Sequence, residues 1–244
     1  MTGWIEHATL RTTPLVSVVM ATRNRSEFFE RSIGSLIAQQ YRNWQLVVVD
    51  DGGDDGAQDR IALFRDPRIV YSRVEPAGAG AARNHGLRLA RGELITYLDD
   101  DNMMHPLWLK AVVWAFEQRT DVDVLYGATV IDDTARLHGL PGAELPSLWL
   151  EPFERASVVE HNVADMGAIA HRRGLETAVF AEDLHIAGDW DLLLSLTADR
   201  DPLVLPVVAL HYYSDAPRRL SNAPNRDRDF ARIAARHAAR AHSR

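Results

Sequence analysis

The residues Glu93-Leu94-Ile95-Thr96-Tyr97-Leu98-Asp99-Asp100-Asp101-Asn102 place a short apolar segment directly before three aspartates. Leucine, isoleucine, threonine and tyrosine in the first part are typical of a strand. Three adjacent carboxylates repel one another unless a cation lies among them, and their oxygens select hard ions such as Mg²⁺, Mn²⁺ or Ca²⁺. Open α/β sheets bind ligands at the carboxyl ends of their strands. The stretch therefore predicts such a sheet with a metal-assisted site after one strand. The alternative is a solvated loop or helix cap before Pro106.

Strand and helix patterns alternate on both sides of this stretch. Strands are predicted at 16–21, 46–50, 69–74, 94–98 and 122–126, and helices at 28–40, 58–64, 81–90 and 106–119. The strands are apolar almost throughout, which is typical of parallel strands covered on both faces. We expect Asn24 to Ser26 to cap the first helix, Gly92 to close the third and Pro106 to open the fourth. The fold class is therefore α/β, with a Rossmann-like, mostly parallel central sheet and helices on both faces.

The alternation weakens after residue 129. Residues 132–160 are rich in proline, glycine and acids, and we expect loops there. Beyond them the sequence predicts a strand at 163–170, a helix at 188–198, a strand at 203–210 and a helical segment at 225–244. We found no internal repeat and no low-complexity linker, so we expect residues 1–244 to form one domain.

The composition of the 244 residues argues against several classes of protein and of functional site. A net charge of −7 argues against a general nucleic-acid binder, which is usually basic. Cysteine is absent, which excludes disulfides, thiolate metal sites and cysteine nucleophiles. There is no signal-peptide pattern and no apolar run near the ~20 residues of a transmembrane helix, so we expect a cytoplasmic location. Lys110 is the only lysine, so phosphate contacts must come from arginine, backbone N–H groups or a metal.

Three other clusters could carry chemistry. Asp50-Asp51-Gly52-Gly53 follows a predicted strand and is either a turn or a carboxylate that binds a base or ribose. The run from Gly78 to Asn84 offers close backbone approach at a helix start and includes Arg83, whose guanidinium can hold a phosphate. In Gly188-Asp189-Trp190-Asp191, Asp189 is either an N-cap or a carboxylate base. Asp191 lies two residues on, so at most one of the two acids should reach the reacting centre.

Together these clusters resemble one family. The chain is similar to family 2 glycosyltransferases of the GT-A fold, including small bacterial members of spore-coat polysaccharide synthesis. The resemblance is carried by residues 16–25, 49–52, 80–87 and 90–102 and, after a gap, by 188–192. It implies transfer of a sugar, with inversion, from a nucleoside diphosphate donor. It also divides the domain into a nucleotide-sugar-binding half at 14–128, a variable acceptor half at 129–222 and a helical tail at 223–244.

The resemblance also implies roles for single residues. Ala21 and Arg23 would line the nucleoside pocket, Asp51 would bind the base, and Arg83 would lie near the base or diphosphate. Asp99-Asp100-Asp101 is similar to the DXD motif: Asp101 would ligate Mn²⁺ or Mg²⁺, and Asp99 or Asp100 would contact ribose or metal-bound water. Asp189 aligns with the general base, and Asp191 is the alternative.

Two departures from the family pattern stand out. Gly53 replaces the usual serine, which predicts a more mobile loop. The histidine that completes the metal shell in many relatives has no clean counterpart, and His211 and Asp215 are the candidates. The C-terminal arginines allow a membrane- or partner-binding helix, but we favour a terminal helix that packs Phe230 and Ile233 on the core.

The expected partners are a nucleoside diphosphate sugar, with UDP or TDP first, and an acceptor that is a glycan, a lipid-linked molecule or a small natural product. We expect no nucleic-acid partner and no transmembrane segment. A homodimer is one possible assembly. A nucleotidyltransferase is an alternative, although residues 21–25 lack the glycine-rich loop usual after its first strand. A catalytically silent nucleotide- or glycan-binding protein is another, and the intact acids argue against it.

Overall fold

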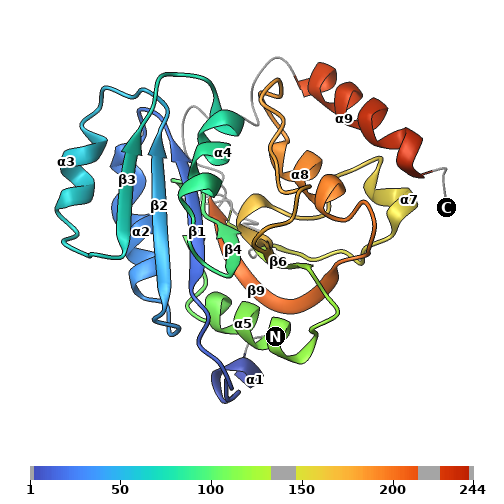
Figure 1. Ribbon diagram of the computed structural model, residues 1–244, viewed down its shortest axis with the longest axis horizontal. Helices are drawn as coiled ribbons and strands as arrows, with labels where there is room; N and C mark the ends of the chain where they lie inside the picture. The colour runs from blue at the N-terminus through green and yellow to red at the C-terminus, as the bar shows by residue number, and fades with distance from the viewer. Residues whose placement is uncertain (1–2, 133–146, 214–225, 242–244) are drawn as a thin grey trace, which may run out of the picture.

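The computed structural model describes residues 3–132, 147–213 and 226–241. In this part of the chain the strands are β1 (Val16–Thr22), β2 (Trp44–Asp50), β3 (Ile69–Arg73), β4 (Leu94–Tyr97), β5 (Met103–Met104), β6 (Val124–Asp132), β7 (Ser147–Trp149), β8 (Ile169–Arg172) and β9 (Leu203–Tyr213). The helices are α1 (Gly3–Glu6), α2 (Phe29–Ile37), α3 (Ala57–Ala62), α4 (Ala79–Leu89), α5 (Trp108–Gln118), α7 (Arg155–Val158), α8 (Gly188–Leu196) and α9 (Arg226–Ala241), with short 3₁₀ helices η1 (Ser26–Phe28) and η2 (Met166–Ala168). Figure 1 shows their arrangement.

The strands form one mixed sheet in the order β3-β2-β1-β4-β8-β6-β9-β5, with β7 paired to β6. The first four strands in this order run parallel, and β4 pairs antiparallel with β8. β6 also pairs antiparallel with β8 but parallel with β9. The expected α/β class is therefore confirmed. The parallel arrangement holds for the nucleotide-binding side, and antiparallel pairing enters from β8 onward.

Helices cover both faces of the sheet (Figure 1). Val16, Val18 and Met20 of β1 pack in a core with α2 and α5, whereas Val19 packs on the opposite side with α4 and α8. Successive side chains of a strand point to opposite faces, so a strand buried on both must be apolar throughout. This burial is the physical reason why the sequence predicts the alternation of strands and helices.

Helix α4 lies unusually close to the sheet. A Cβ atom on Gly86 would stand 2.5 Å from the Val19 Cγ1 atom, so only glycine permits the observed separation. The close approach brings the N-terminus of α4 to the carboxyl ends of β1 and β2.

Three predicted boundary signals were wrong. Helix α2 has Phe28 at its N-cap without a side-chain cap bond, and the Asn24 Oδ1 atom instead accepts from the Asp54 N–H at 2.7 Å. Helix α4 ends in extended backbone at Ala90, so Gly92 is no left-handed cap; a Cβ there would meet the Ser17 nitrogen at 2.5 Å. Helix α5 begins at Trp108, two residues after Pro106.

The second half also differs in detail from the prediction. The segment predicted as a strand at 163–170 is a loop, then η2, and strand β8 begins only at Ile169. Asp165 causes the shift, because its Oδ1 atom accepts from the Gly167 N–H at 3.0 Å and starts the 3₁₀ turn. The strands β5 and β7 and the short helices α1 and α7 were not predicted, because two to four residues carry too little periodicity to recognise.

Helix α1 is attached to the outer surface of α5. The Trp4 and Trp114 rings meet edge to face with centroids 4.6 Å apart. The Lys110 Nζ donates to the Glu6 carbonyl at 2.7 Å. Within residues 3–132, 147–213 and 226–241, no helix combines the length and apolar content needed to cross a bilayer.

Candidate active site

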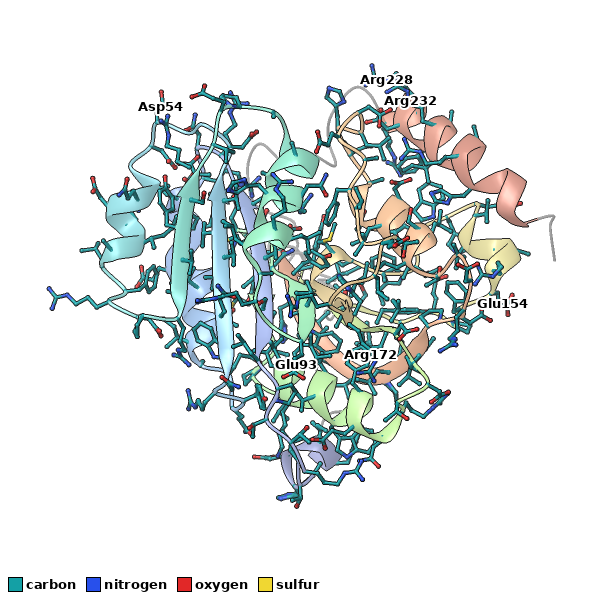
Figure 2. All side chains as sticks on the ribbon, in the orientation of Figure 1. Asp54, Glu93, Glu154, Arg172, Arg228 and Arg232 are labelled. Atoms are coloured by element: carbon teal, nitrogen blue, oxygen red, sulfur yellow. The ribbon has the colours of Figure 1, made fainter. Side chains whose placement is uncertain are left out.

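The carboxyl ends of β1, β2 and β4 open into a cavity of about 560 Å³. Its walls come from both halves of the chain: the β1–α2 and β2–α3 loops, the start of α4, the acids after β4, the segment 181–188 and α9. Figure 2 shows that Asp54 and Arg228 lie toward this edge of the molecule, whereas Glu93 and Arg172 lie at the other end of the sheet. The cavity has the volume usual for a small-molecule site.

The three acids after β4 all line the cavity, and each is engaged by a neighbour. Arg83 donates to the Asp99 Oδ1 atom at 2.9 Å, and Thr22 donates to the Asp100 Oδ2 atom at 2.8 Å. Arg25 forms ion pairs with both Asp100 and Asp101. The Asp triplet is therefore not a solvated loop, since Asp100 and Asp101 are buried.

Asp51 directly follows β2 and lines the cavity. Its carboxylate accepts from the backbone N–H groups of Ala77 at 2.7 Å and Gly78 at 3.0 Å, and the Arg23 guanidinium is 3.8 Å away. These contacts join the loops after β2 and β3. Ala21, Arg23 and Asp51 all line the cavity.

Hydrogen bonds to neighbouring side chains hold the loop at Gly53, for which the sequence predicts greater mobility. The Gly53 N–H donates to the Asp50 Oδ1 atom at 2.7 Å, and its carbonyl accepts from the Arg73 guanidinium at 3.0 Å. A Cβ at this position would stand 2.9 Å from the Asn24 Oδ1 atom. Glycine is thus the residue that this packing accommodates.

Helix α4 contributes two residues with different tasks. Arg83 faces the cavity, where it meets Asp99 and lies over the Phe180 ring at 5.5 Å. Asn84 does not line the cavity and instead binds the backbone of Phe180 in the second half of the chain. Its side chain donates to the Phe180 carbonyl at 2.9 Å and accepts from the Phe180 N–H at 2.8 Å. The close approach of Gly80 to the Ala181 carbonyl completes this contact between the two halves.

Asp189 lies in the first turn of α8 and points into the cavity. Ala187, not Asp189, is the N-cap residue, and it adopts a left-handed conformation with φ of 55°. The Asp189 Oδ2 atom accepts from Asn162 at 2.9 Å, and Oδ1 accepts from the Trp190 N–H at 2.9 Å. A carboxylate has about four acceptor positions, so two remain for a ligand.

Asp165 is a cavity residue that the sequence motifs did not reveal. It is buried, lines the cavity and has the Gly167 N–H as a donor to its carboxylate. Its one sequence signal is an acid inside an otherwise apolar segment. Arg25 and Asn162 are two more such residues. Arg25 belongs to the stretch 16–25 that resembles the family but has no role implied for it, and Asn162 shows no signal at all.

Burial, together with repulsion between the carboxylates, raises the pKa of several of these acids. Burial raises the pKa of Asp100 to about 7, although Arg25 acts against this shift. Burial, and then Asp99 and Asp189, raise the pKa of Asp165 well above its usual value. Burial is also the main cause of the raised pKa of Asp189, with Asp99 adding to it. The cavity therefore carries more carboxylates than its arginines neutralise.

Two predicted site residues lie elsewhere. Asp191 is buried on the far side of α8, where its carboxylate accepts from Arg236 at 2.9 Å and meets the His237 Nε2 atom at 2.9 Å. The helical geometry separates it from Asp189, so it does not line the cavity. His211 stacks on His105, with ring centroids 6.3 Å apart, and does not line the cavity either. Asp215 lies outside the described residues.

The predicted metal set of Asp101, Asp99 and His211 is therefore not assembled. In the described part of the chain, no three His, Asp or Glu side chains are grouped to hold a metal ion. Asp99 and Asp101 still fit a hard divalent cation, because their oxygens face the cavity and excess negative charge surrounds them. Few protein ligands suffice when substrate phosphates supply the others.

Comparison with known proteins gives a family match and similar folds. Residues 17–181 match the model of the family described as glycosyl transferase family 2. The succinoglycan biosynthesis protein ExoO of Rhizobium meliloti (strain 1021) is 33% identical over 202 residues, which cover 76% of this chain and 56% of ExoO. This chain thus spans little more than half the length of that relative.

Solved structures show the same GT-A fold. The S. aureus TarS 1-349 complex with UDP-GlcNAc superposes with a TM-score of 0.73 at 20% identity, covering 91% of this chain and 66% of TarS 1-349. The mannosyltransferase PcManGT from Pyrobaculum calidifontis, in complex with GDP-Man and Mn²⁺, has a TM-score of 0.60 at 18% identity and covers 98% of this chain and 67% of PcManGT.

Proposed function

Because the chain belongs to glycosyl transferase family 2, we propose that it transfers a sugar from a nucleoside diphosphate sugar to an acceptor hydroxyl, with inversion and with the help of a divalent cation. The observation that carries the proposal is that Asp51, the Asp99–Asp101 triplet and Asp189 line one cavity although they are far apart in sequence. A nucleoside site, a diphosphate site and a base are what a single-displacement transfer requires.

In this proposal the donor lies along the carboxyl ends of β1, β2 and β4. Ala21, Arg23 and Asp51 receive the nucleoside, and Arg83 lies where it can contact the diphosphate. TarS 1-349 binds UDP-GlcNAc and PcManGT binds GDP-Man, so the shared fold accommodates either base. A UDP- or TDP-linked sugar is our proposal, because Asp51 can accept the N3–H of a pyrimidine.

Asp101 and Asp99 would hold the divalent cation, for which Mn²⁺ or Mg²⁺ is proposed. When bound, the cation stabilises the negative charge of the departing diphosphate. Arg83 adds a second positive charge on the same side, while Arg25 holds the acids in place. The Mn²⁺ bound to PcManGT supports a metal, since the two chains share the fold.

Asp189 would act as the general base. Asn162 and the Trp190 N–H orient its carboxylate, and two acceptor positions remain for the acceptor hydroxyl. Its raised pKa makes it a stronger base than an exposed aspartate, and a base near the working pH is the most effective. The acceptor O–H bond breaks toward Asp189 while the new bond forms at the anomeric carbon and the diphosphate leaves from the opposite side.

The test is a panel of UDP-, TDP- and GDP-sugars with and without Mn²⁺ or Mg²⁺. We expect one nucleoside diphosphate to bind in calorimetric titration only when the metal is present, and its sugar to be turned over, with water as the acceptor where no other is known. Metal-dependent binding without turnover would favour the catalytically silent alternative. Neither binding nor turnover with any member of the panel would refute the proposal.

A further inference from the structure

The segment that leads to Asp189 has no regular structure of its own. Between Phe180 and the start of α8, residues 181–187 run along the cavity and supply much of its wall. They end at Ala187, whose left-handed backbone is unusual for a residue other than glycine. Such a conformation persists only where surrounding contacts enforce it.

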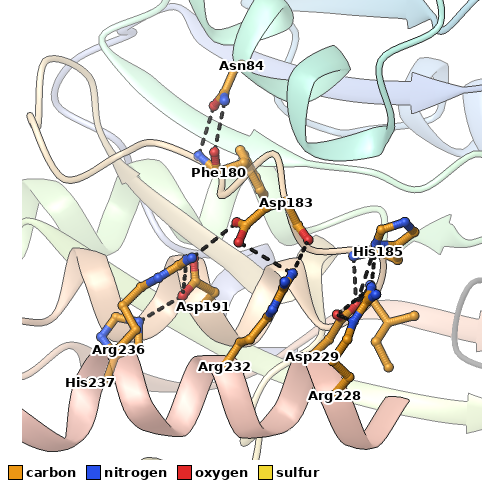
Figure 3. A network of polar contacts seen from close by, with 11 residues as sticks. Asn84, Phe180, Asp183, His185, Asp191, Arg228, Asp229, Arg232, Arg236 and His237 are labelled. Carbon is orange, nitrogen blue, oxygen red and sulfur yellow. Dashed lines mark hydrogen bonds and ion pairs between the residues drawn. The ribbon is translucent and has the colours of Figure 1, made fainter. Parts of the chain in front are cut away.

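Helix α9 supplies those contacts (Figure 3). The Asp229 carboxylate is fully buried, and its Oδ2 atom accepts from the backbone N–H groups of His185 at 2.8 Å and Ile186 at 3.2 Å. Burial acts to raise the pKa of Asp229, but these two N–H groups and Arg228 outweigh it and lower the pKa. Asp229 is therefore held as an anion on the two residues before Ala187.

Two further residues of α9 bind the same region. Arg236 contacts one acid before Asp189 and one after it. It donates to Asp183 at 3.2 Å and to both oxygens of Asp191 at 2.9 and 3.0 Å. Phe230 meets the Trp190 ring edge to face, with centroids 5.2 Å apart. Arg228, Arg232 and Arg236 of α9 thus face acids of this chain, which agrees with the packed terminal helix expected from the sequence.

We propose that Asp229 is a positioning residue for the transfer reaction: by binding the His185 and Ile186 backbone it fixes residues 181–187, and so aims Asp189 into the cavity. The inference rests on the proposed function of Asp189. Asn84 holds the other end of the segment at Phe180. The nucleoside side of the cavity lies on β1, β2 and β4 and does not depend on α9.

Donor binding and catalysis should therefore separate in variants of Asp229. With Asp229→Ala, both amides lose their acceptor, and Asp189 moves. We expect kcat for UDP release from the turned-over donor to fall about 10- to 100-fold, the effect of a misplaced reacting group. The donor KM and the calorimetric UDP affinity with Mn²⁺ should stay within about twofold. Asp229→Asn keeps one acceptor oxygen, so its kcat should lie between the kcat of the original protein and that of Asp229→Ala.

Asp227→Asn is the matched control. Asp227 lies on the same helix, two residues before Asp229, but it is exposed and lines no part of the cavity. This variant should keep the kcat of the original protein. If Asp229→Ala does not fold, Arg236→Lys tests the same attachment of residues 181–187 to α9, because one lysine nitrogen cannot contact Asp183 and Asp191 together as the two guanidinium nitrogens do. We expect the same separation of kcat from UDP affinity, with kcat falling about threefold to tenfold.

Amide hydrogen exchange gives a readout that does not need turnover. We expect faster exchange across residues 183–189 in Asp229→Ala and unchanged exchange in β1 and β2. An unchanged kcat, or a parallel loss of kcat, UDP affinity and melting temperature, would overturn the positioning role. If the original protein releases no UDP from any donor, the proposed function fails. Unchanged amide hydrogen exchange in Asp229→Ala would then also overturn the inference that Asp229 fixes the segment before Asp189.

Discussion

The Asp189 carboxylate is held in one orientation, which the proposed role as general base requires. Asn162 and the Trp190 N–H fix its carboxylate, and its helix turns it into the cavity. Asp189→Asn keeps the shape but cannot take a proton. We therefore expect kcat to fall by roughly 10²- to 10⁴-fold, the usual contribution of a general base. Calorimetric donor affinity should not change, and near-normal turnover would assign the base elsewhere.

The same carboxylate should set the acid side of the pH profile. A protonated Asp189 cannot accept a proton, so kcat should rise as the pH passes upward through its pKa. Because burial raises that pKa above 3.8, the rise should occur at higher pH than for an exposed aspartate. The measurement is kcat against pH at saturating donor. A rate already constant from pH 4 upward would contradict this prediction.

Asp165 should cost the protein stability at neutral pH. Its pKa is 3.8 in the unfolded chain and well above that value when folded, so the folded state holds the proton more tightly. The penalty is absent at low pH and grows as the pH rises above the unfolded pKa. Asp165→Asn should thus raise the melting temperature at pH 7, by ~2–4 °C for each kcal/mol removed, and change it little near pH 3. Equal shifts at both pH values would contradict this cause.

At the scale of elements, the contact between α4 and β1 depends on Gly86. Gly86→Ala places a methyl group against Val19, and overpacking of this kind costs ~1–3 kcal/mol. Gly34→Ala in α2 is the control, because a Cβ there meets nothing within 4 Å and alanine favours a helix by ~0.5–1 kcal/mol. Chemical denaturation should give opposite signs for the two variants. Two changes of the same sign would show that α4 can move away from the sheet.

Strands buried on both faces could be predicted from sequence for a clear physical reason. β1, β2 and β4 were recognised because a short, continuous apolar run between turn residues is typical of a strand covered on both sides. The strand expected at 163–170 failed because Asp165 makes a local hydrogen bond that competes with the ladder, and such competition is invisible in hydropathy. The cap expected at Asn24 failed for a similar reason: the Asn24 Oδ1 atom accepts from the Asp54 N–H, which lies in another loop, and caps no helix.

At the scale of the whole molecule, binding of donor and metal should appear as stability. A ligand that binds only the folded state adds about 2.7 kcal/mol at 100 times its Kd. UDP with Mn²⁺ should therefore raise the melting temperature by ~5–10 °C, and more than either alone. Asp101→Ala should lose this shift, and the exposed Asp59→Ala should keep it. A full shift in Asp101→Ala would remove that residue from the metal site.

The sequence brought together residues that the structure also brings together, while their roles stay predictions. Asp51 and the Asp triplet follow strands, Arg83 and Asp189 lie in the first half of a helix, and all of them line the cavity. Asn162 and Asp165 come from loops whose path is decided by packing between distant segments, so no short pattern marks them. His211 and Asp191 were placed wrongly because the direction of a side chain on its element depends on register, which the sequence left open.

The contact between Lys110 and Glu6 has a practical consequence. The chain contains one lysine and no cysteine, and that lysine lies on α5, outside the cavity wall. Amine-directed coupling to a surface or dye has a single side chain to react with, and the cavity stays open to donor. A cysteine introduced near Asp229 would be the only thiol, so one fluorophore could report whether the surroundings of α9 change when donor is added.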